Sequence, residues 1–203
     1  RLDLYWANYG PSWLMRNDGG GKFTDVAPAM GVVINRHLVA VGWGDYDNDG
    51  KPDLYTCGYL VGHPNIRDYL LHNEGDHFSD VTPAYMLKHD SDHGVAWADY
   101  DRDGALDLAL CDHEASGVVS IYHNELPAAQ AAHSLQVLVL DANGRYTKTG
   151  SEVRVYAAGT RKVLGAALVD SGSAYSSQSA LPVHFGLPLP GISRRILRAA
   201  LIL

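Results

Sequence analysis

Short apolar or alternating runs, separated by turn residues, make up most of the chain. The segments HLVAVGW (37–43) and LYTCGYL (54–60) are rich in β-branched and aromatic residues, with Gly, Asn, Asp and Pro between such runs. Later in the chain, LQVLVL (135–140), EVRVYAAG (152–159) and KVLGAALVDSG (162–172) have the same texture and are divided by DANGR and AGTRK turns. The pattern predicts an all-β protein.

The first part of the chain is an internal repeat. The segments RLDLYWANYG, DGKPDLYTCGYL and DGALDLALCDHE share one frame, with an offset of 50 residues from Asp3 to Asp53 and of 54 residues from Asp53 to Asp107. A period near 50 residues, built from short strands, is typical of propeller blades. The chain carries one complete unit with a partial unit on each side. The residues that align are Asp3, Asp53 and Asp107, followed by Asn17, Asn73 and Asn124.

Composition and charge narrow the classes of partner. Of the 203 residues, 46% are hydrophobic and 19% are charged, which is a globular composition. A net charge of −7 argues against a nucleic-acid partner, and no run of 18 apolar residues exists to form a transmembrane segment. Eight of the 23 acidic residues lie in two stretches, DYDNDGKPD (45–53) and DYDRDGALD (99–107), so the acidity is local.

The two acidic stretches have the spacing of a calcium-binding loop. Calcium is bound by six to eight oxygen atoms, and aspartates at positions 1, 3, 5 and 9 can turn four carboxylates toward one ion. Glycine at position 6 allows a sharp turn, and the variable residue at position 7 offers its backbone carbonyl. Without an ion, neighbouring carboxylates repel by roughly 1 kcal/mol per pair in water. The predicted ligands are Asp45, Asp47, Asp49, Asp53 and the Lys51 carbonyl in the first stretch, and Asp99, Asp101, Asp103, Asp107 and the Ala105 carbonyl in the second.

The two stretches have three other interpretations. An EF-hand needs a bidentate Glu at position 12 and flanking helices, whereas that position is Thr56 or Leu110 and the flanks have strand patterns. The EF-hand is therefore excluded. Solvated Asp-Gly turns without metal and a DxD nucleotide-sugar site are the other two. Two nine-residue copies in one repeat frame favour structural calcium over both.

The units resemble the FG-GAP, or VCBS, repeats of integrin-type β-propellers, whose blades carry a D-x-D-x-D-G-x-x-D calcium loop between their first two strands. This resemblance implies an all-β partial β-propeller with structural Ca2+. SAYSSQSALPVHFGLP (173–188) resembles the ASPIC/UnbV segment that follows VCBS repeats in the cartilage acidic protein family. The implied organisation is a repeat region at 1–126, a linker at 127–134, a β-rich segment at 135–190 and a tail at 191–203.

The resemblance implies a non-catalytic, calcium-stabilised scaffold that binds protein or glycan outside the cell or in a calcium-rich lumen. The alternative is an accessory propeller domain of a larger hydrolase or lyase, which a catalytic carboxylate or histidine in one blade only would favour. Propeller closure takes typically four to eight blades, so we expect neighbouring blades or a partner chain to complete this one. We also expect exposed apolar surface in the strands that carry Val41, Trp43, Val95 and Trp97.

Two cysteines occupy one repeat position, four residues past the last aspartate of their units. Cys111 with His113 has the residue types of a nucleophile pair, but equivalent positions favour shared packing as small buried hydrophobes. Equivalent positions on neighbouring blades should lie beyond the Cα separation of about 7 Å that a disulfide spans, so Cys57 and Cys111 are predicted to be unbridged. HDSDH (89–93) is either a small metal site through its two histidines or a polar loop leading into the next blade.

Overall fold

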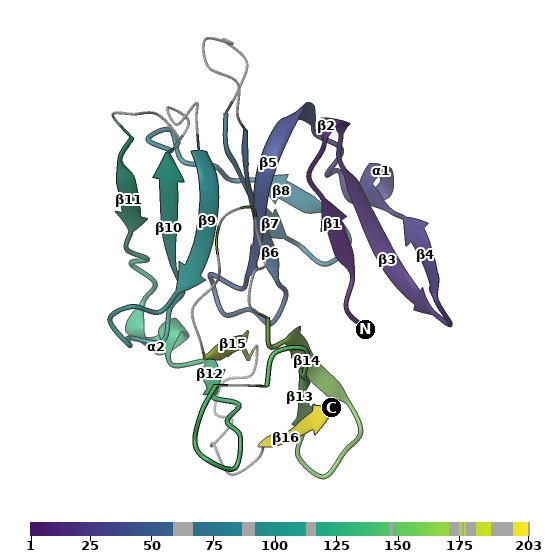
Figure 1. Cartoon of the computed structure of the whole chain (residues 1–203), viewed down its shortest axis with the longest axis vertical. Coiled ribbons are helices and arrows are strands. Elements are labelled where there is room, and N and C mark those ends of the chain that lie inside the picture. The colour runs from purple at the N-terminus through teal and green to yellow at the C-terminus, as the bar shows by residue number, and fades with distance from the viewer. Residues whose placement is uncertain are drawn as a thin grey trace.

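The repeats form a fan of β-sheets. The computed structural model describes residues 1–58, 67–86, 92–112, 117–146, 148–170, 175, 177, 182–187 and 197–202. Figure 1 shows three repeat sheets side by side, with smaller C-terminal sheets beyond one end of the fan. The predicted all-β class and partial β-propeller are confirmed. Within the described ranges, the helices are the single turns α1 (Ala27–Met30) and α2 (Ala128–Ala131), and none is long enough to cross a membrane.

The complete repeat unit forms the central sheet, which is antiparallel throughout. Its two apolar runs become neighbouring strands, paired from Leu38 opposite Gly58 to Gly44 opposite Asp53. A short strand of the first unit joins one edge of this sheet. In sheet order the strands are β2 (Tyr9–Pro11), β5 (Asn35–Gly44), β6 (Asp53–Gly58), β7 (Tyr69–Asn73) and β8 (Phe78–Asp80).

The two partial units form three-stranded antiparallel sheets on either side. The first sheet contains β1 (Leu4–Trp6), β3 (Trp13–Gly19) and β4 (Lys22–Asp25). The third contains β9 (Asp92–Ala98), β10 (Asp107–Asp112) and β11 (Val119–Tyr122). Strands β1, β6 and β10 occupy the same place in their units, because each begins at or just after the aligned aspartate.

Two apolar layers hold the three sheets together. Tyr5 and Leu54 belong to the layer between the first and second sheets, whereas Tyr55 and Leu108 belong to the layer between the second and third. Alternate side chains of β6 thus point to opposite neighbours, as the two-residue period of a strand requires. The leucine after the aligned aspartate is 0% exposed at Leu54 and 3% at Leu108, but 52% at Leu4.

Apolar surface is exposed on the two outer faces of the fan. The expectation that Val95 and Trp97 lie in this surface is wrong, because β9 packs against β5 and leaves them 1% and 5% exposed. Trp43, at the position equivalent to Trp97, is 38% exposed. The exposed residues of the outer sheets include Leu4, Trp6, Trp13 and Phe23 of the first and Val119 and Ile121 of the third.

Two glycines of β5 make room for Trp97. A Cβ atom at Gly42 would lie 3.1 Å from the Trp97 indole, and one at Gly44 would lie 2.8 Å from it. Only a strand without side chains at these two positions lets the indole lie this close to the backbone. The equivalent residues of the third unit are Ala96 and Ala98.

The C-terminal part folds around a core of its own. Its two antiparallel sheets consist of β12 (Ser134–Val137) with β15 (Val183–Gly186), and β14 (Val163–Leu168), β13 (Glu152–Ala157) and β16 (Leu197–Ile202) in that order. The buried residues between them are Val139, Val153, Val155, Val169, Phe185 and Leu187.

The C-terminal strands differ in extent from the sequence pattern. The run LQVLVL is strand only as far as Val137. Strand β16 falls in the tail at 191–203, where it pairs with β13, and α2 falls in the segment expected to be a linker. The proposed boundaries at 126, 134 and 190 stay predictions.

Candidate metal sites in two aspartate-rich loops

The two acidic stretches form equivalent loops in neighbouring sheets. Loop 1 (residues 45–53) joins β5 to β6, and loop 2 (residues 99–107) joins β9 to β10. Each loop therefore connects the first two strands of its unit, as the resemblance to FG-GAP repeats implies. The loop backbone lies where two adjacent strands leave the sheet together, which brings the first and ninth positions close to each other.

Both loops turn through two left-handed residues. The glycine at position 6 has a φ of 85° at Gly50 and 97° at Gly104, as its residue type predicts. Position 4 is also left-handed, with a φ of 58° at Asn48 and 66° at Arg102. Asparagine is one of the non-glycine residues that tolerate this conformation, whereas an arginine there is uncommon. The same turn is built from two different side chains, so the loop geometry belongs to the repeat.

The carboxylate at position 1 organises the backbone of each loop. In loop 1 the Asp45 carboxylate accepts hydrogen bonds from the amides of Asp49 (3.0 Å) and Gly50 (2.9 Å). In loop 2 the Asp99 carboxylate accepts the equivalent bonds from Asp103 (3.1 Å) and Gly104 (3.1 Å). These bonds fold positions 5 and 6 back over position 1, so that the carboxylates converge.

The carboxylate at position 9 ties the loop to the rest of its sheet. Asp53 accepts from the amides of Tyr46 (3.2 Å) and Asn73 (2.8 Å), so one side chain joins the loop to β7. Asp107 accepts the same pair of bonds from Tyr100 (3.1 Å) and Asn124 (2.9 Å).

The same tie occurs in the first unit. The amide of Asn17 donates to the Asp3 carboxylate at 2.7 Å. The Asn17 side chain also donates to the Leu2 carbonyl at 3.2 Å, as the Asn73 side chain does to the Pro52 carbonyl at 2.9 Å. The alignment of Asp3 and Asn17 with the later units is therefore present in the structure.

Oxygen atoms of several aspartates converge in each loop. Asp45, Asp47 and Asp53 offer carboxylate oxygens within 4.8 Å of one another. Burial, followed by the charges of Asp49 and Asp47, raises the pKa of Asp45 to about 7. Burial also raises the pKa of Asp53 to about 7. A bound cation would favour the charged form of both groups instead.

Loop 2 gathers its carboxylates in a more open setting. Asp99, Asp101 and Asp103 offer oxygens within the same 4.8 Å limit. Burial raises the pKa of Asp99 as well. Both donor sets consist mainly of hard oxygen ligands, which fits Ca2+ and its flexible coordination. Ligation by the four aspartates of each loop, and by the carbonyls of Lys51 and Ala105, stays a prediction.

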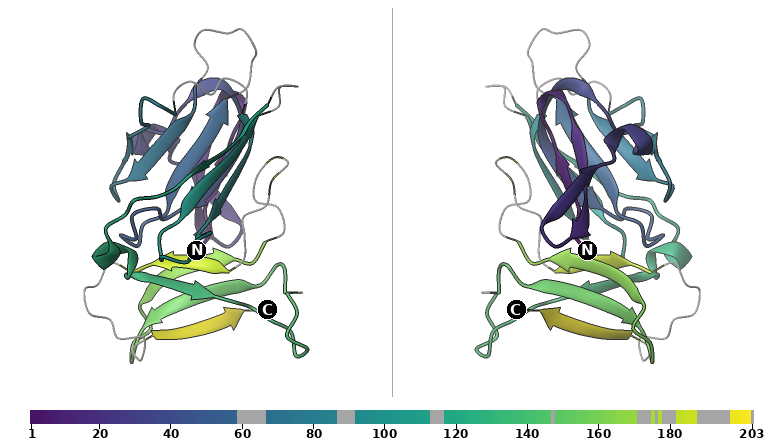
Figure 2. Two further views of the ribbon diagram at one scale, coloured as in Figure 1. Left: turned by 90° about the vertical axis from the view of Figure 1, so that its left-hand side faces the viewer. Right: turned by 90° about the vertical axis from the view of Figure 1, so that its right-hand side faces the viewer.

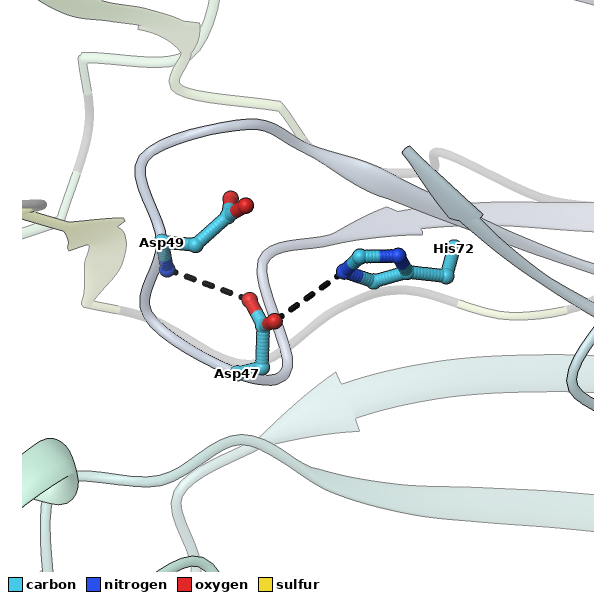
Figure 3. A group of neighbouring side chains, drawn as sticks. All are labelled: Asp47, Asp49 and His72. Carbon is cyan, nitrogen blue, oxygen red and sulfur yellow. Dashed lines mark hydrogen bonds and ion pairs between the residues drawn. The ribbon is translucent and has the colours of Figure 1, made fainter. Parts of the chain in front are cut away.

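Two histidines that the aspartate spacing does not predict contact these clusters. His72 Nε2 lies 3.0 Å from Asp47 Oδ2, and Figure 3 shows the imidazole pointing at that carboxylate from β7. His123 Nδ1 lies 3.2 Å from Asp107 Oδ1 and 3.6 Å from Asp101 Oδ2. The signal for them in the sequence is the His-Asn-Glu shared by LHNE (71–74) and YHNE (122–125), next to the aligned asparagines.

The side chain of Lys51 also interacts with its surroundings, in addition to the predicted metal ligation by the Lys51 backbone carbonyl. Its ammonium group forms an ion pair with Asp49 and donates to the Asn73 carbonyl at 3.0 Å. The hydrogen bond with Asp49 raises the pKa of Lys51. The lysine thus neutralises part of the loop charge, and loop 2 has Ala105 at the same position.

Comparison with protein families agrees with this geometry. A family model for FG-GAP-like repeats matches residues 1–56 and 59–110, which include both loops. The chain belongs to the FG-GAP-like repeat family. No curated protein gives a significant match to this chain. The family match ends before residues 173–188, so the resemblance of that segment to ASPIC/UnbV, and to the cartilage acidic protein family, stays a prediction.

The structure describes some of the cysteines and histidines that the sequence of this FG-GAP-like chain singles out. Cys57 and Cys111 are not bridged to each other, as predicted; Cys57 is fully buried and Cys111 is half-buried. His113, which follows Cys111 in the segment CDHE, and His89 of the HDSDH segment lie outside the described residues. His93 is described, and its ring lies 5.6 Å from that of Tyr175.

Proposed function

We propose that this chain is a calcium-stabilised, non-catalytic part of a β-propeller that binds a protein or glycan ligand outside the cell or in a calcium-rich lumen. The observation that carries the proposal is the agreement of the two loops, which share the same turn and the same hydrogen bonds from backbone amides to carboxylates. An ion in such a loop would fix the junction of three strands, because the ninth aspartate already joins the loop to the strand that follows. Repetition of the loop in two neighbouring units favours a structural role over a catalytic one.

We further propose that additional blades complete the propeller, either from the same parent protein or from a partner chain. The open fan supports this proposal, as does the difference in burial between the equivalent leucines that follow the aligned aspartates. Leu54 and Leu108 are each covered by the preceding sheet, whereas the equivalent Leu4 is 52% exposed beside Trp6, which is 55% exposed. A blade of the same kind packed on this face would bury both.

Isothermal titration calorimetry of the full chain with Ca2+ tests the metal sites. We expect two sites with dissociation constants of about 10⁻⁴–10⁻³ M, the range of extracellular calcium modules. At a free calcium concentration of about 100 times the dissociation constant, each site adds about 2.7 kcal/mol, or roughly 5–10 °C in melting temperature. Asp47→Ala and Asp101→Ala should each remove one site and its share of the stabilisation.

Asp76→Ala is the matched control, because Asp76 is an exposed aspartate whose side chain is 90% accessible and which lies in neither loop. This variant should bind two ions with unchanged affinity. The metal proposal fails if the wild-type chain binds no calcium up to about 10 mM, well above the extracellular range. It also fails if the loop variants and the control lose the same amount of binding.

A further inference from the structure

Loop 1 and loop 2 have the same backbone but different surroundings. At position 4, Arg102 of loop 2 is exposed, whereas Asn48 of loop 1 is 1% exposed. The difference arises because the C-terminal sheets and α2 lie against the loop end of the fan, which is visible from both sides in Figure 2. Loop 1 therefore forms part of the contact between the repeats and the C-terminal segment.

The buried Asn48 side chain joins four parts of the molecule. Its amide nitrogen donates to the Gly104 carbonyl of loop 2 at 3.0 Å, and lies 3.4 Å from the Ala131 carbonyl of α2. Its amide oxygen faces His184 Nε2 of β15 at 2.8 Å. Since the amide nitrogen faces carbonyls, the oxygen must accept, and His184 must carry its proton on Nε2. Burial lowers the pKa of His184 to about 4, which agrees with this neutral ring.

Strand β15 passes directly over loop 1 with no spare room. A Cβ atom at Gly186 would overlap the Asp45 carboxylate and lie 2.5 Å from the Asn48 Cα. The Asp45 carboxylate is at position 1 of the loop, where it holds positions 5 and 6 in place. A small outward movement of this carboxylate would therefore displace β15.

Two glutamines add further contacts between the C-terminal segment and the loops. Gln130 of α2 donates to the Asp47 carbonyl at 2.7 Å. Gln136 of β12 donates to the Asp99 carboxylate of loop 2. Since β12 pairs with β15, the sheet that carries His184 and Gly186 contacts both loops.

We propose that the cation bound in loop 1 controls the docking of the C-terminal sheets, and that Asn48 is the residue that couples the two. This inference rests on the proposed calcium site. An ion would hold the loop carboxylates together and fix the surface under β15, whereas without the ion this surface is held only by the hydrogen bonds within the loop. Coupling between two sites is reciprocal, so docking must strengthen ion binding by the same factor by which the ion strengthens docking.

Hydrogen exchange of the full chain, with calcium and with EGTA, measures the docking. We expect calcium to slow exchange of the β12 and β15 amides, and of the Leu187 amide that donates to His133, by about fivefold or more, the usual range of coupling between sites. Asn48→Gly keeps the left-handed turn and all predicted ligands but removes the bridging side chain. This variant should still bind two ions. Its affinity for the ion in loop 1 should fall by the same factor as the calcium-dependent protection of β12 and β15.

Arg102→Gly is the matched control at the same turn position of loop 2, and it should leave the protection of β12 and β15 at the wild-type level. His184→Ala removes the bridge from its other side, and replaces Asn48→Gly if that variant does not fold. Calcium binding without any change in the protection of β12 and β15 would overturn the coupling and leave the proposed function standing. Equal effects of Asn48→Gly and Arg102→Gly would also overturn it, and a wild-type chain that binds no calcium would end both proposals.

Discussion

Three equivalent leucines provide an internal test of how the sheets pack. Leu54→Ala and Leu108→Ala remove side chains that are 0% and 3% exposed, and Leu4→Ala removes one that is 52% exposed. Each change deletes three carbons, worth about 2.4 kcal/mol of transfer free energy when fully buried. With the cavity that remains in a packed layer, the two buried changes should each cost about 2–5 kcal/mol.

Leu4→Ala should cost much less, because its position is open to solvent. Half burial leaves about 1 kcal/mol of the transfer term, and water fills the space so that no cavity is left. Urea unfolding in saturating calcium, followed by tryptophan fluorescence at a concentration where sedimentation shows a monomer, gives the three free energies. If Leu4→Ala destabilises the monomer as much as Leu54→Ala, the outer face of the first sheet is covered in solution, and the assignment of this face as open is refuted.

Three other properties should follow from the structure. Since burial raises the pKa values of Asp45 and Asp53 to about 7, above their usual range, the metal-free folded chain binds more protons than the unfolded chain between about pH 4 and pH 7. Its free energy of unfolding in EDTA should therefore fall as the pH rises through this window, with calcium opposing the fall; a flat profile in EDTA would contradict this. Thiol titration of the denatured, unreduced chain should count two thiols, and in the native chain Cys111 should react before the fully buried Cys57; a count of zero in a monomer would mean a disulfide. Deleting residues 197–203 removes the strand paired with β13, so exchange of the β13 amides should accelerate while the repeat sheets stay protected; unchanged exchange would speak against this pairing.

The repeat sheets and the loop backbone could be predicted because the signals are local. Apolar runs flanked by turn residues marked β5 and β6, and the glycine at position 6 marked the left-handed turn. The aligned aspartates and asparagines gave the register, since the Asp53–Asn73 bond recurs as Asp3–Asn17. Burial of Val95 and Trp97 was missed because it depends on which sheet face meets a neighbour, and alternation alone does not specify this.

Features that join distant parts of the chain were not predictable in this way. His72 reaches loop 1 only because β7 returns beside β6, and His184 reaches Asn48 across 136 residues of sequence. The pairing of β16 with β13 likewise depends on the three-dimensional placement of a strand that has no repeat partner. No spacing rule connects such residues, so their contacts become visible only in the folded chain.

The glycine pair beneath Trp97 also limits how this array could be rearranged. A repeat protein gains a blade when a unit is duplicated, and the new blade must fit the surface of the neighbouring blade against which it packs. If the third unit were duplicated, the tryptophan of the additional copy would pack against Ala96 and Ala98 instead of Gly42 and Gly44. Its indole would meet two methyl groups in the space that the glycines leave open, and such overpacking typically costs about 1–3 kcal/mol. The contact surfaces of the blades therefore determine which unit can pack beside which, and a change in their order would introduce steric strain.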